Sequence, residues 1–166
     1  DFAQGAGGDP TRYAYRPQAR DEPGEESLEH ERRPSRVMTA EALLMRQYLG
    51  WTRDDPNLVG GADFLLTELP SLGTPDKPNR DTYYWYYATQ VMFHMKGDRW
   101  TRWNEKLRPL LVDGQERTGP LAGSWNPGGE IPDRWGHAGG RLYVTAMNLL
   151  ILEVYYRYLP IYQGLE

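Results

Sequence analysis

The sequence has 166 residues, a formal net charge of −4 and no cysteine. This length fits one globular domain of ordinary size. The lysines and arginines are dispersed along a mildly acidic chain, so the sequence lacks the basic stripe that nucleic-acid binding needs. Without cysteine the chain has no disulfide framework, no thiolate metal site and no cysteine nucleophile, and its composition assigns no compartment.

The first 34 residues are rich in Gly, Pro, Arg and Glu, and residues 21–33 are mostly charged, with Leu28 as their one large apolar residue. Such a composition predicts a tail or linker. We therefore expect a charged tail over residues 1–34 and one helical domain over residues 35–166. Because the chain begins at Asp1 without an initiator Met, we also expect it to be a piece of a longer protein.

Two helices are predicted directly after this tail. The first extends from Met38 to Gly50, because apolar residues recur there at helical spacing and glycine is typical of a helix C-terminus. The second begins at Asp55, an acidic N-cap followed by proline at the first helical position, and its leucines fall on one stripe. We expect the first helix to be buried and the second to be amphipathic.

The next two helices follow a loop that is rich in Gly and Pro. The segment from Asp81 to Gly97 opens with a second N-cap signal, Asp81, and is apolar nearly all round, which predicts a buried helix. The segment after Asp98 has tryptophans and leucines on one face and charged residues on the other, which predicts an amphipathic helix. Pro109 is expected to kink or end that helix, because proline has no N–H to donate.

The last predicted helix extends from Arg141 to Leu159, after a long glycine-rich loop over residues 113–140. It is dominated by apolar residues and is predicted to be buried. Its length would suit a membrane span, but it contains polar and charged residues, namely Thr145, Asn148, Glu153 and Arg157. We therefore predict a helix of a soluble protein and no membrane span.

Buried and amphipathic helices alternate, and the buried helices are similar in sequence. Alignment of Thr39–Met45 with Thr145–Ile151 superposes Ala40 on Ala146. Ala88 takes the same place in the helix between them, 48 residues after Ala40 and 58 residues before Ala146. Repeats of about fifty residues are typical of stacked helical hairpins. The sequence thus predicts an all-α fold, with the segments 38–50, 81–97 and 141–159 as inner helices and the amphipathic helices outside them.

The segment after the fourth helix contains a QW-type motif. Gln115 follows the helix end at Leu110-Leu111, and Gly123-Ser124-Trp125 follows after a spacer. In this order of residues, the region 35–166 resembles the α/α-toroid superfamily of squalene and hopene cyclases, protein prenyltransferase β-subunits and complement-type thioester domains, and in particular cyclase-like repeat proteins of some bacteria. The resemblance implies an incomplete ring of about two and a half hairpins. It also implies structural roles for Gln115, Gly123 and Trp125.

The same resemblance defines which catalytic groups to look for. Cyclases of this superfamily use an Asp-x-Asp-Asp acid, and the prenyltransferases bind zinc through Asp, Cys and His. The adjacent pair Asp54-Asp55 is expected to cap a helix, and the chain has no cysteine. We therefore predict no catalytic residue, no metal and no cofactor for this chain alone. The alternative is a segment of a terpenoid cyclase or prenyl-transferring enzyme whose catalytic residues lie outside it.

Two groups of residues are candidates for ligand binding. The rings of Tyr83, Tyr84, Trp85 and Tyr87 would line a cavity, as aromatic residues do in cyclases, although packing between helices is the simpler interpretation. The loop before the last helix holds the second group, Asp133, His137 and Arg141.

In that loop, the carboxylate and the imidazole could bind a cation or serve in acid–base chemistry. Gly139 and Gly140 with Arg141 could bind an anionic group such as a diphosphate. Pairing of Asp133 with Arg134, and glycines that permit close approach to a helix, are the simpler interpretations. His94 is predicted to be a core histidine.

We expect a repeat domain without its own catalytic machinery, acting in ligand binding or protein interaction. Its predicted partners are an apolar or isoprenoid-like ligand, a second copy of the chain or the remainder of a larger toroid. A purely structural repeat is a further alternative.

Overall fold

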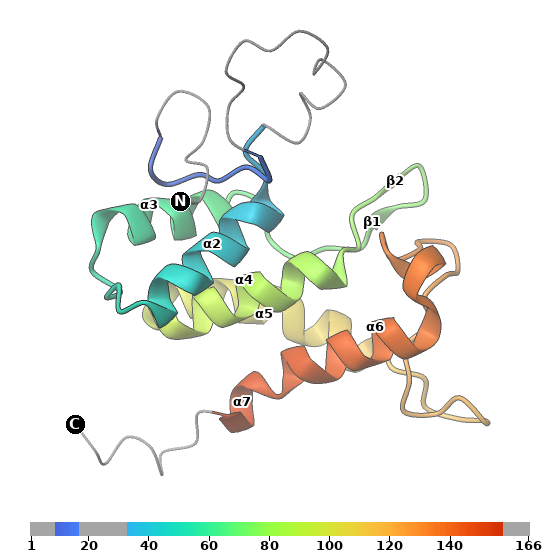
Figure 1. Cartoon of the computed structure of the whole chain (residues 1–166). Coiled ribbons are helices and arrows are strands. Elements are labelled where there is room, and N and C mark those ends of the chain that lie inside the picture. The colour runs from blue at the N-terminus through green and yellow to red at the C-terminus, as the bar shows by residue number, and fades with distance from the viewer. Residues whose placement is uncertain (1–8, 17–32, 158–166) are drawn as a thin grey trace, which may run out of the picture.

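The computed structural model describes residues 9–16 and 33–157. This part of the chain is mostly helical, with one small antiparallel hairpin formed by β1 (Gly73–Thr74) and β2 (Lys77–Pro78). The helices shown in Figure 1 are α2 (Arg36–Tyr48), α3 (Pro56–Leu65), α4 (Thr82–Met95), α5 (Gly97–Asp113), α6 (Gly136–Leu152) and α7 (Val154–Arg157). The predicted all-α class is confirmed at this level.

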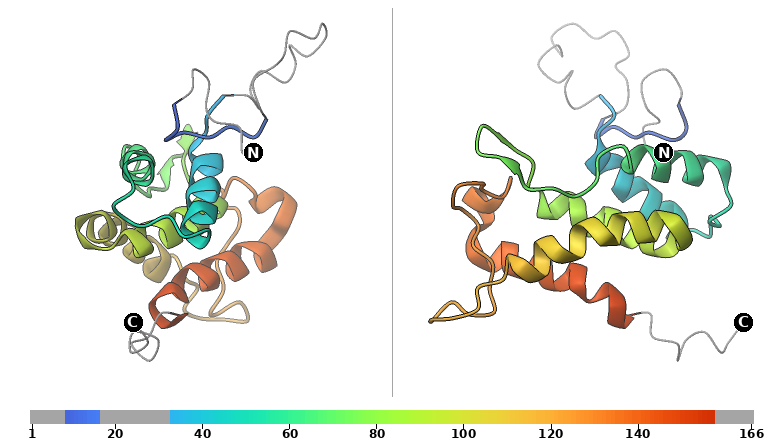
Figure 2. Two further views of the ribbon diagram at one scale, coloured as in Figure 1. Left: turned by 60° about the vertical axis from the view of Figure 1, so that its left-hand side comes forward. Right: turned by 180° about the vertical axis from the view of Figure 1, so that it is seen from behind.

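Helix α4 lies at the centre of the molecule and packs against α2, α3, α5 and α6. Figure 1 shows that α2, α4 and α6 run in the same direction, with their N-terminal ends on one side of the molecule. The right-hand view of Figure 2 shows α3 and α5 in front of this layer. Consecutive helices therefore form hairpins in two layers, as the alternation of buried and amphipathic segments predicts.

Three helices begin at side-chain caps. Ser35 Oγ accepts a hydrogen bond from the Met38 amide at the start of α2. Asp55 accepts from the amides of Asn57 and Leu58 at the start of α3, and Asp81 accepts from the Tyr84 amide at the start of α4. Each acceptor satisfies amides that have no partner inside the helix. The caps predicted at Asp55 and Asp81 are thereby confirmed.

Helix α5 does not end at Pro109, so one of the two predicted effects of this proline is absent. It continues through this residue to Asp113. Pro109 lies on the exposed face of α5, where water can bind the carbonyl group that the missing N–H leaves free. Buried Trp103, Leu107 and Leu111 on the opposite face hold the helix against the core.

The last helix differs from the prediction in its start and in its burial. Its first turn begins at Gly136, and Gly140 interrupts it with φ 63° and ψ −166°, so that a regular helix follows from Arg141. The part of the prediction beyond Arg157 lies outside the described residues. The expectation of a fully buried helix is wrong, because Leu142 and Leu149 are exposed and no described helix covers that face of α6.

The core lies between α2, α3, α4 and α5 and also contains Tyr13 from the N-terminal segment. Residues 9–16 form no helix, but they pack on the bundle. The Tyr13 amide donates to Thr39 Oγ1, and the Tyr13 carbonyl accepts from the Ser35 amide. Part of the charged N-terminal region therefore belongs to the folded body.

Candidate ligand-binding site

A cavity of about 1450 Å³ lies among the described residues where α2, α4 and α6 begin. The starts of the helices contribute Ser35 and Arg36, Asp81 and Tyr83, and the turn from Gly136 to Gly139. Because the three helices run in the same direction, residues that are far apart in sequence meet at this end of the layer (Figure 1). We call this cavity the N-terminal pocket.

One wall of the pocket is the loop from Pro127 to Trp135, which is fixed to the start of α4. Asp133 is buried, and its carboxylate accepts hydrogen bonds from the Thr82 amide at 3.1 Å and from the Trp135 amide at 3.0 Å. The Arg134 amide donates to the Arg80 carbonyl at 2.8 Å. Asp133 therefore caps α4 from a distant part of the chain and sets the position of the pocket wall.

The charged side chains of the pocket form pairs of opposite sign. Arg36 contacts Glu68 at 2.8 Å, and Arg134 lies 3.7 Å from Asp81. Burial raises the pKa of Asp81, although the Tyr84 amide and Arg134 oppose this shift. Burial also lowers the pKa of Arg80, and the negative charge of Asp133 opposes that shift.

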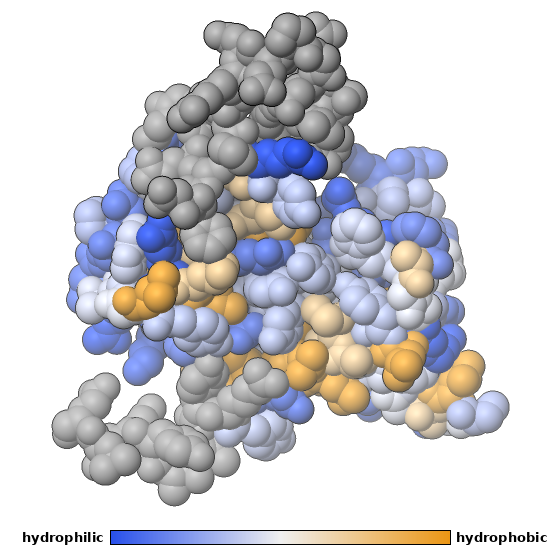
Figure 3. All heavy atoms as spheres, in the orientation of Figure 1, coloured by the Kyte–Doolittle hydropathy of each residue, from blue (hydrophilic) through white to orange (hydrophobic). Residues whose placement is uncertain are grey.

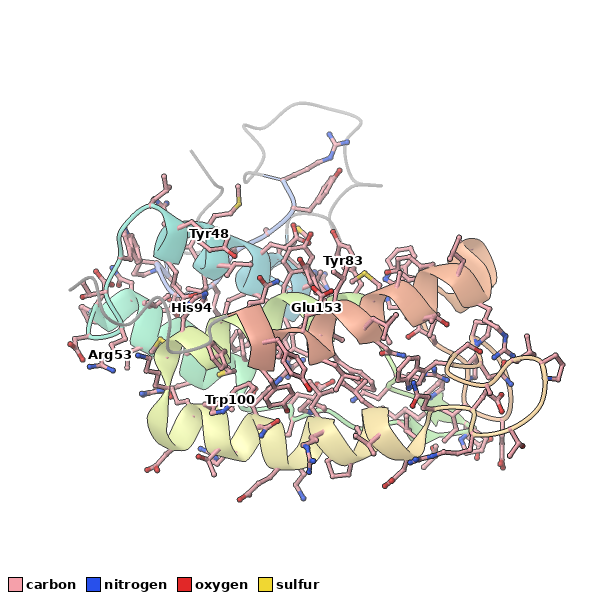
Figure 4. The ribbon with its side chains drawn as sticks, turned by 90° about the horizontal axis from the view of Figure 1, so that it is seen from below. Tyr48, Arg53, Tyr83, His94, Trp100 and Glu153 are labelled. Carbon is pink, nitrogen blue, oxygen red and sulfur yellow. The ribbon has the colours of Figure 1, made fainter. Side chains whose placement is uncertain are left out.

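Tyrosines from two helices supply aromatic surface to the pocket. Tyr83 is half-buried and Tyr84 is buried, and Tyr143 of α6 lies on the same wall. Figure 4 shows Tyr83 where α4 passes between α2 and α6. Burial raises the pKa of Tyr143 to about 12, helped by the nearby Asp133 and Asp81 carboxylates. These phenols are therefore neutral over the physiological range and act as hydrogen-bonding aromatic surface.

Glu41 of α2 lies beside Tyr83 and extends this polar contact between helices. Its carboxyl lies near the Tyr83 hydroxyl, and the ring of Tyr83 meets that of Tyr87 edge-on, with the centroids 5.0 Å apart. Burial raises the pKa of the Glu41 carboxyl, and the Tyr83 hydroxyl opposes this shift. Burial raises the pKa of Tyr83 as well, and the neighbouring Tyr87 and Glu41 add to that shift.

The pocket brings together only part of the predicted site. Tyr83, Tyr84, Asp133 and His137 all line it. Trp85 and Tyr87 do not. Tyr87 lies on the same face of α4 as Tyr83 but one turn further from the start of the helix. Trp85 projects from another face, where it is buried and lines a separate cavity of about 310 Å³. Trp85 thus takes the packing role that was the simpler interpretation.

Arg141 lies away from the pocket and interacts with the loop that follows α5. Its guanidinium donates to Ser124 Oγ at 3.0 Å and lies 3.6 Å from Glu116. Arg141 therefore does not meet Asp133 and His137 at the pocket, and its part in anion binding with Gly139 and Gly140 stays a prediction. The break at Gly140 separates the turn that holds His137 from the regular helix that holds Arg141.

The residues of the QW-type motif meet beside the end of α5. The Gln115 amide donates to the Gly123 carbonyl at 3.0 Å, and Gln115 pairs with Trp125 in an antiparallel bridge. The Trp125 indole is 2% exposed and donates to the Leu111 carbonyl at 2.8 Å. Gly123 adopts a φ of +85°, which favours glycine.

This arrangement stabilises the C-terminal end of α5. The Leu111 carbonyl belongs to the last turn, where no further helical amide is available. The Gln115 amide bonds inside its own loop and not to the start of the next helix, which differs from the role that the resemblance implies. Trp125 provides the interhelical link instead, because its own amide donates to Thr145 Oγ1 of α6.

Several pocket residues carry no signal in the sequence. Met38, Phe64 and Tyr143 contribute apolar surface, and Arg36 and Arg80 contribute charge. Each occupies an ordinary position in a helix or loop, and only the packing of the elements brings it to the pocket. The predicted core histidine His94 is half-buried at the other end of α4, where burial lowers its pKa (Figure 4).

Comparison with models of protein families, with curated proteins and with solved structures gives no significant match. The resemblance to the α/α-toroid superfamily therefore stays a prediction. Among residues 9–16 and 33–157 there is no group of three or more His, Asp or Glu side chains suited to a metal ion. None of the described helices combines the length and the apolar character that crossing a bilayer requires.

Proposed function

We propose that this chain is a helical repeat domain of the α/α-toroid type, without its own catalytic machinery, and that it binds an apolar, isoprenoid-like ligand in the N-terminal pocket. The main support is the cavity of about 1450 Å³ where three helices begin. Small-molecule pockets usually measure about 300–1000 Å³ and are mostly apolar. The volume here suits a ligand with a long hydrocarbon chain.

The chemistry of the walls favours an apolar ligand over a diphosphate. Each of the three arginines of the pocket already has a carboxylate near it: Arg36 faces Glu68, Arg134 faces Asp81, and Arg80 interacts electrostatically with Asp133. An anion would have to displace these partners, so it would gain little electrostatic energy. Met38, Phe64 and the tyrosines offer apolar surface for a chain, and the paired charges can hydrogen-bond a small polar end.

Two features support the toroid interpretation. Helices α2, α4 and α6 lie side by side and run in the same direction, with α3 and α5 in a second layer (Figures 1 and 2). Trp125 of the QW-type motif links the end of one hairpin to the next helix. Both features are expected of stacked helical hairpins.

The proposal is tested by measuring binding of farnesol, a C15 isoprenoid alcohol, with native mass spectrometry and titration calorimetry. Ala138 is exposed and lines the pocket, whereas Ala122 is exposed in a loop away from it. We expect Ala138→Trp to abolish binding by filling the pocket and Ala122→Trp to bind as the wild type does. Absence of binding to the wild type, or equal binding by both variants, would contradict the proposal. Conversion of farnesol to a product would favour the enzyme alternative.

A further inference from the structure

Tyr143 of α6 brings an aromatic ring and a hydroxyl group to the wall of the N-terminal pocket. The side chain is half-buried and lines the pocket together with Gly139. The phenol lies near the carboxylates of Asp133 and Asp81, and among the described residues neither carboxylate hydrogen-bonds to it. A neutral phenol can both donate and accept a hydrogen bond. Tyr143 therefore offers a polar group to a ligand that enters the pocket.

The break in α6 at Gly140 sets the position of this ring. In a regular helix, Cβ atoms four residues apart lie about 5–6 Å from one another. A Cβ added to Gly139 would instead lie 2.6 Å from the Tyr143 Cβ and 2.5 Å from the Tyr143 Cγ, so the ring lies against the backbone of Gly139. Gly140 permits this approach, because its φ of 63° and ψ of −166° turn the chain out of the helical path. The two glycines together hold Tyr143 on the pocket wall.

The charges around the phenol favour a neutral polar group. Asp81 is paired with Arg134, and Asp133 interacts electrostatically with Arg80, so each carboxylate already has a cation near it. A cationic ligand would gain little beside these pairs, and an anionic ligand would meet two carboxylates. Asp81 Oδ2 lies 3.7 Å from Arg134 Nε, which is longer than a hydrogen bond, so this oxygen can accept one from a ligand. A phenol and a carboxylate near each other suit a hydroxyl group, which both accepts and donates.

We propose that Tyr143 makes the pocket specific for a neutral prenyl alcohol, by donating a hydrogen bond to the ligand hydroxyl, which in turn donates to Asp81. This inference rests on the proposed function, because it concerns the polar end of the ligand in the same pocket. The hydrocarbon chain then lies on the apolar surface that Met38 and Phe64 provide. Prenyl acids, and hydrocarbons without a polar end, should bind more weakly.

Competition between farnesol and farnesene tests this assignment, because farnesene has the same C15 chain without the hydroxyl group. The protein is incubated with equal concentrations of both, and the bound ligands are extracted and measured by gas chromatography. We expect the wild type to prefer farnesol by about three- to tenfold, the size of one net hydrogen bond. Tyr143→Phe should lose most of this preference and bind farnesene as the wild type does. Tyr156→Phe is the matched control, because Tyr156 is 73% exposed on α7, and it should keep the preference.

Gly139→Ala tests the position of the ring without removing the hydroxyl group. The added Cβ would meet Tyr143 Cγ at 2.5 Å, so the ring has to move, and the preference for farnesol should fall as in Tyr143→Phe. Gly128→Ala is the control for this variant, because Gly128 also lines the pocket but a Cβ there would meet no atom closer than 3.8 Å. It should keep the preference. Circular dichroism should show that both variants stay folded.

Apolar ligands also adsorb to exposed apolar surface outside the pocket. Leu142 and Leu149 of α6 are 83% and 47% exposed, and Figure 3 shows hydrophobic side chains gathered along this part of the surface. Ala138→Trp, which fills the pocket, measures this background. The preference for farnesol is therefore calculated from the ligand that the wild type binds in excess of Ala138→Trp.

Several outcomes would overturn the inference. Equal binding of farnesol and farnesene by the wild type, or an unchanged preference in Tyr143→Phe, would show that the phenol does not select the polar end, although the pocket still binds an isoprenoid. Tighter binding of farnesoic acid or farnesylamine than of farnesol would show that the polar end is charged. A wild type that binds neither farnesol nor farnesene would overturn the proposed function and this inference together.

Discussion

Replacement of Trp125 by Phe tests whether the indole caps helix α5. The ring is 2% exposed, and its N–H donates to the Leu111 carbonyl at 2.8 Å. Phe keeps most of the apolar contact but leaves this buried carbonyl without a donor, which costs about 1–3 kcal/mol. The smaller ring also leaves a space of roughly 40 Å³, or about 1 kcal/mol at ~24 cal/mol per Å³. We expect Trp125→Phe to lower the free energy of unfolding by about 2–4 kcal/mol.

Trp103→Phe is the matched control for this measurement. Trp103 is 0% exposed and donates to Thr89 Oγ1 at 3.0 Å, while that hydroxyl itself donates to the Trp85 carbonyl. Loss of the Trp103 indole therefore leaves the hydroxyl with one hydrogen bond. We expect a smaller cost of about 1–2 kcal/mol, mostly from the space left by the smaller ring.

Urea unfolding followed by circular dichroism at 222 nm measures both variants. The slope with urea should stay unchanged, so that the difference in midpoint reports stability directly. If Trp125→Phe costs no more than Trp103→Phe, the orphaned Leu111 carbonyl does not contribute and the capping role of the indole is refuted.

Three further predictions concern single backbone or charge features. Lys96 has φ 59° and ψ −171°, a region of backbone conformation that is typical of glycine. Lys96→Gly should therefore increase the free energy of unfolding by about 1 kcal/mol and raise the melting temperature. A destabilised variant would contradict this prediction. A Cβ on Gly136 would lie 2.3 Å from the Pro127 carbonyl oxygen, whereas a Cβ on Gly128 would meet no atom closer than 3.8 Å. Gly136→Ala should therefore lower the free energy of unfolding, measured with urea, by about 1–3 kcal/mol, and Gly128→Ala should lower it much less. Burial raises the pKa of Asp81 in the folded state, so the folded protein binds this proton more tightly than the unfolded chain does. Protonation of Asp81 therefore stabilises the fold below the ordinary pKa of about 3.9, and this stabilisation is lost as the pH rises through the raised pKa. The stability of the wild type relative to Asp81→Asn should thus be greater at pH 3.5 than at pH 7, and an equal difference at both pH values would refute the assignment.

Local signals predicted most of the helices. Asp55 and Asp81 were identified as N-caps, because a cap bonds amides two or three residues further along the same chain. The amphipathic character of α5 also followed from the sequence, since helical periodicity assigns residues to faces without knowledge of the neighbours. Pro109 misled the prediction, because its effect depends on whether the free carbonyl faces water.

The N-terminal pocket depended on tertiary structure. Asp133 bonds the Thr82 amide across 51 residues of sequence, and nothing in the local sequence around either residue indicates that contact. Tyr83 and Tyr87 lie one turn apart on the same face of α4, but only Tyr83 lines the pocket, because the pocket lies where α4 begins. The packing of α2 and α6 against α4 places it at that end.

The sequence by itself thus determined a mostly helical chain, the caps at Asp55 and Asp81, and the alternation of apolar and amphipathic segments, because these follow from interactions over a few residues. The tertiary structure decided that Arg141 lies away from Asp133 and that one face of α6 is exposed. Both depend on which elements pack together, and that is set by the sum of many contacts between distant parts of the chain.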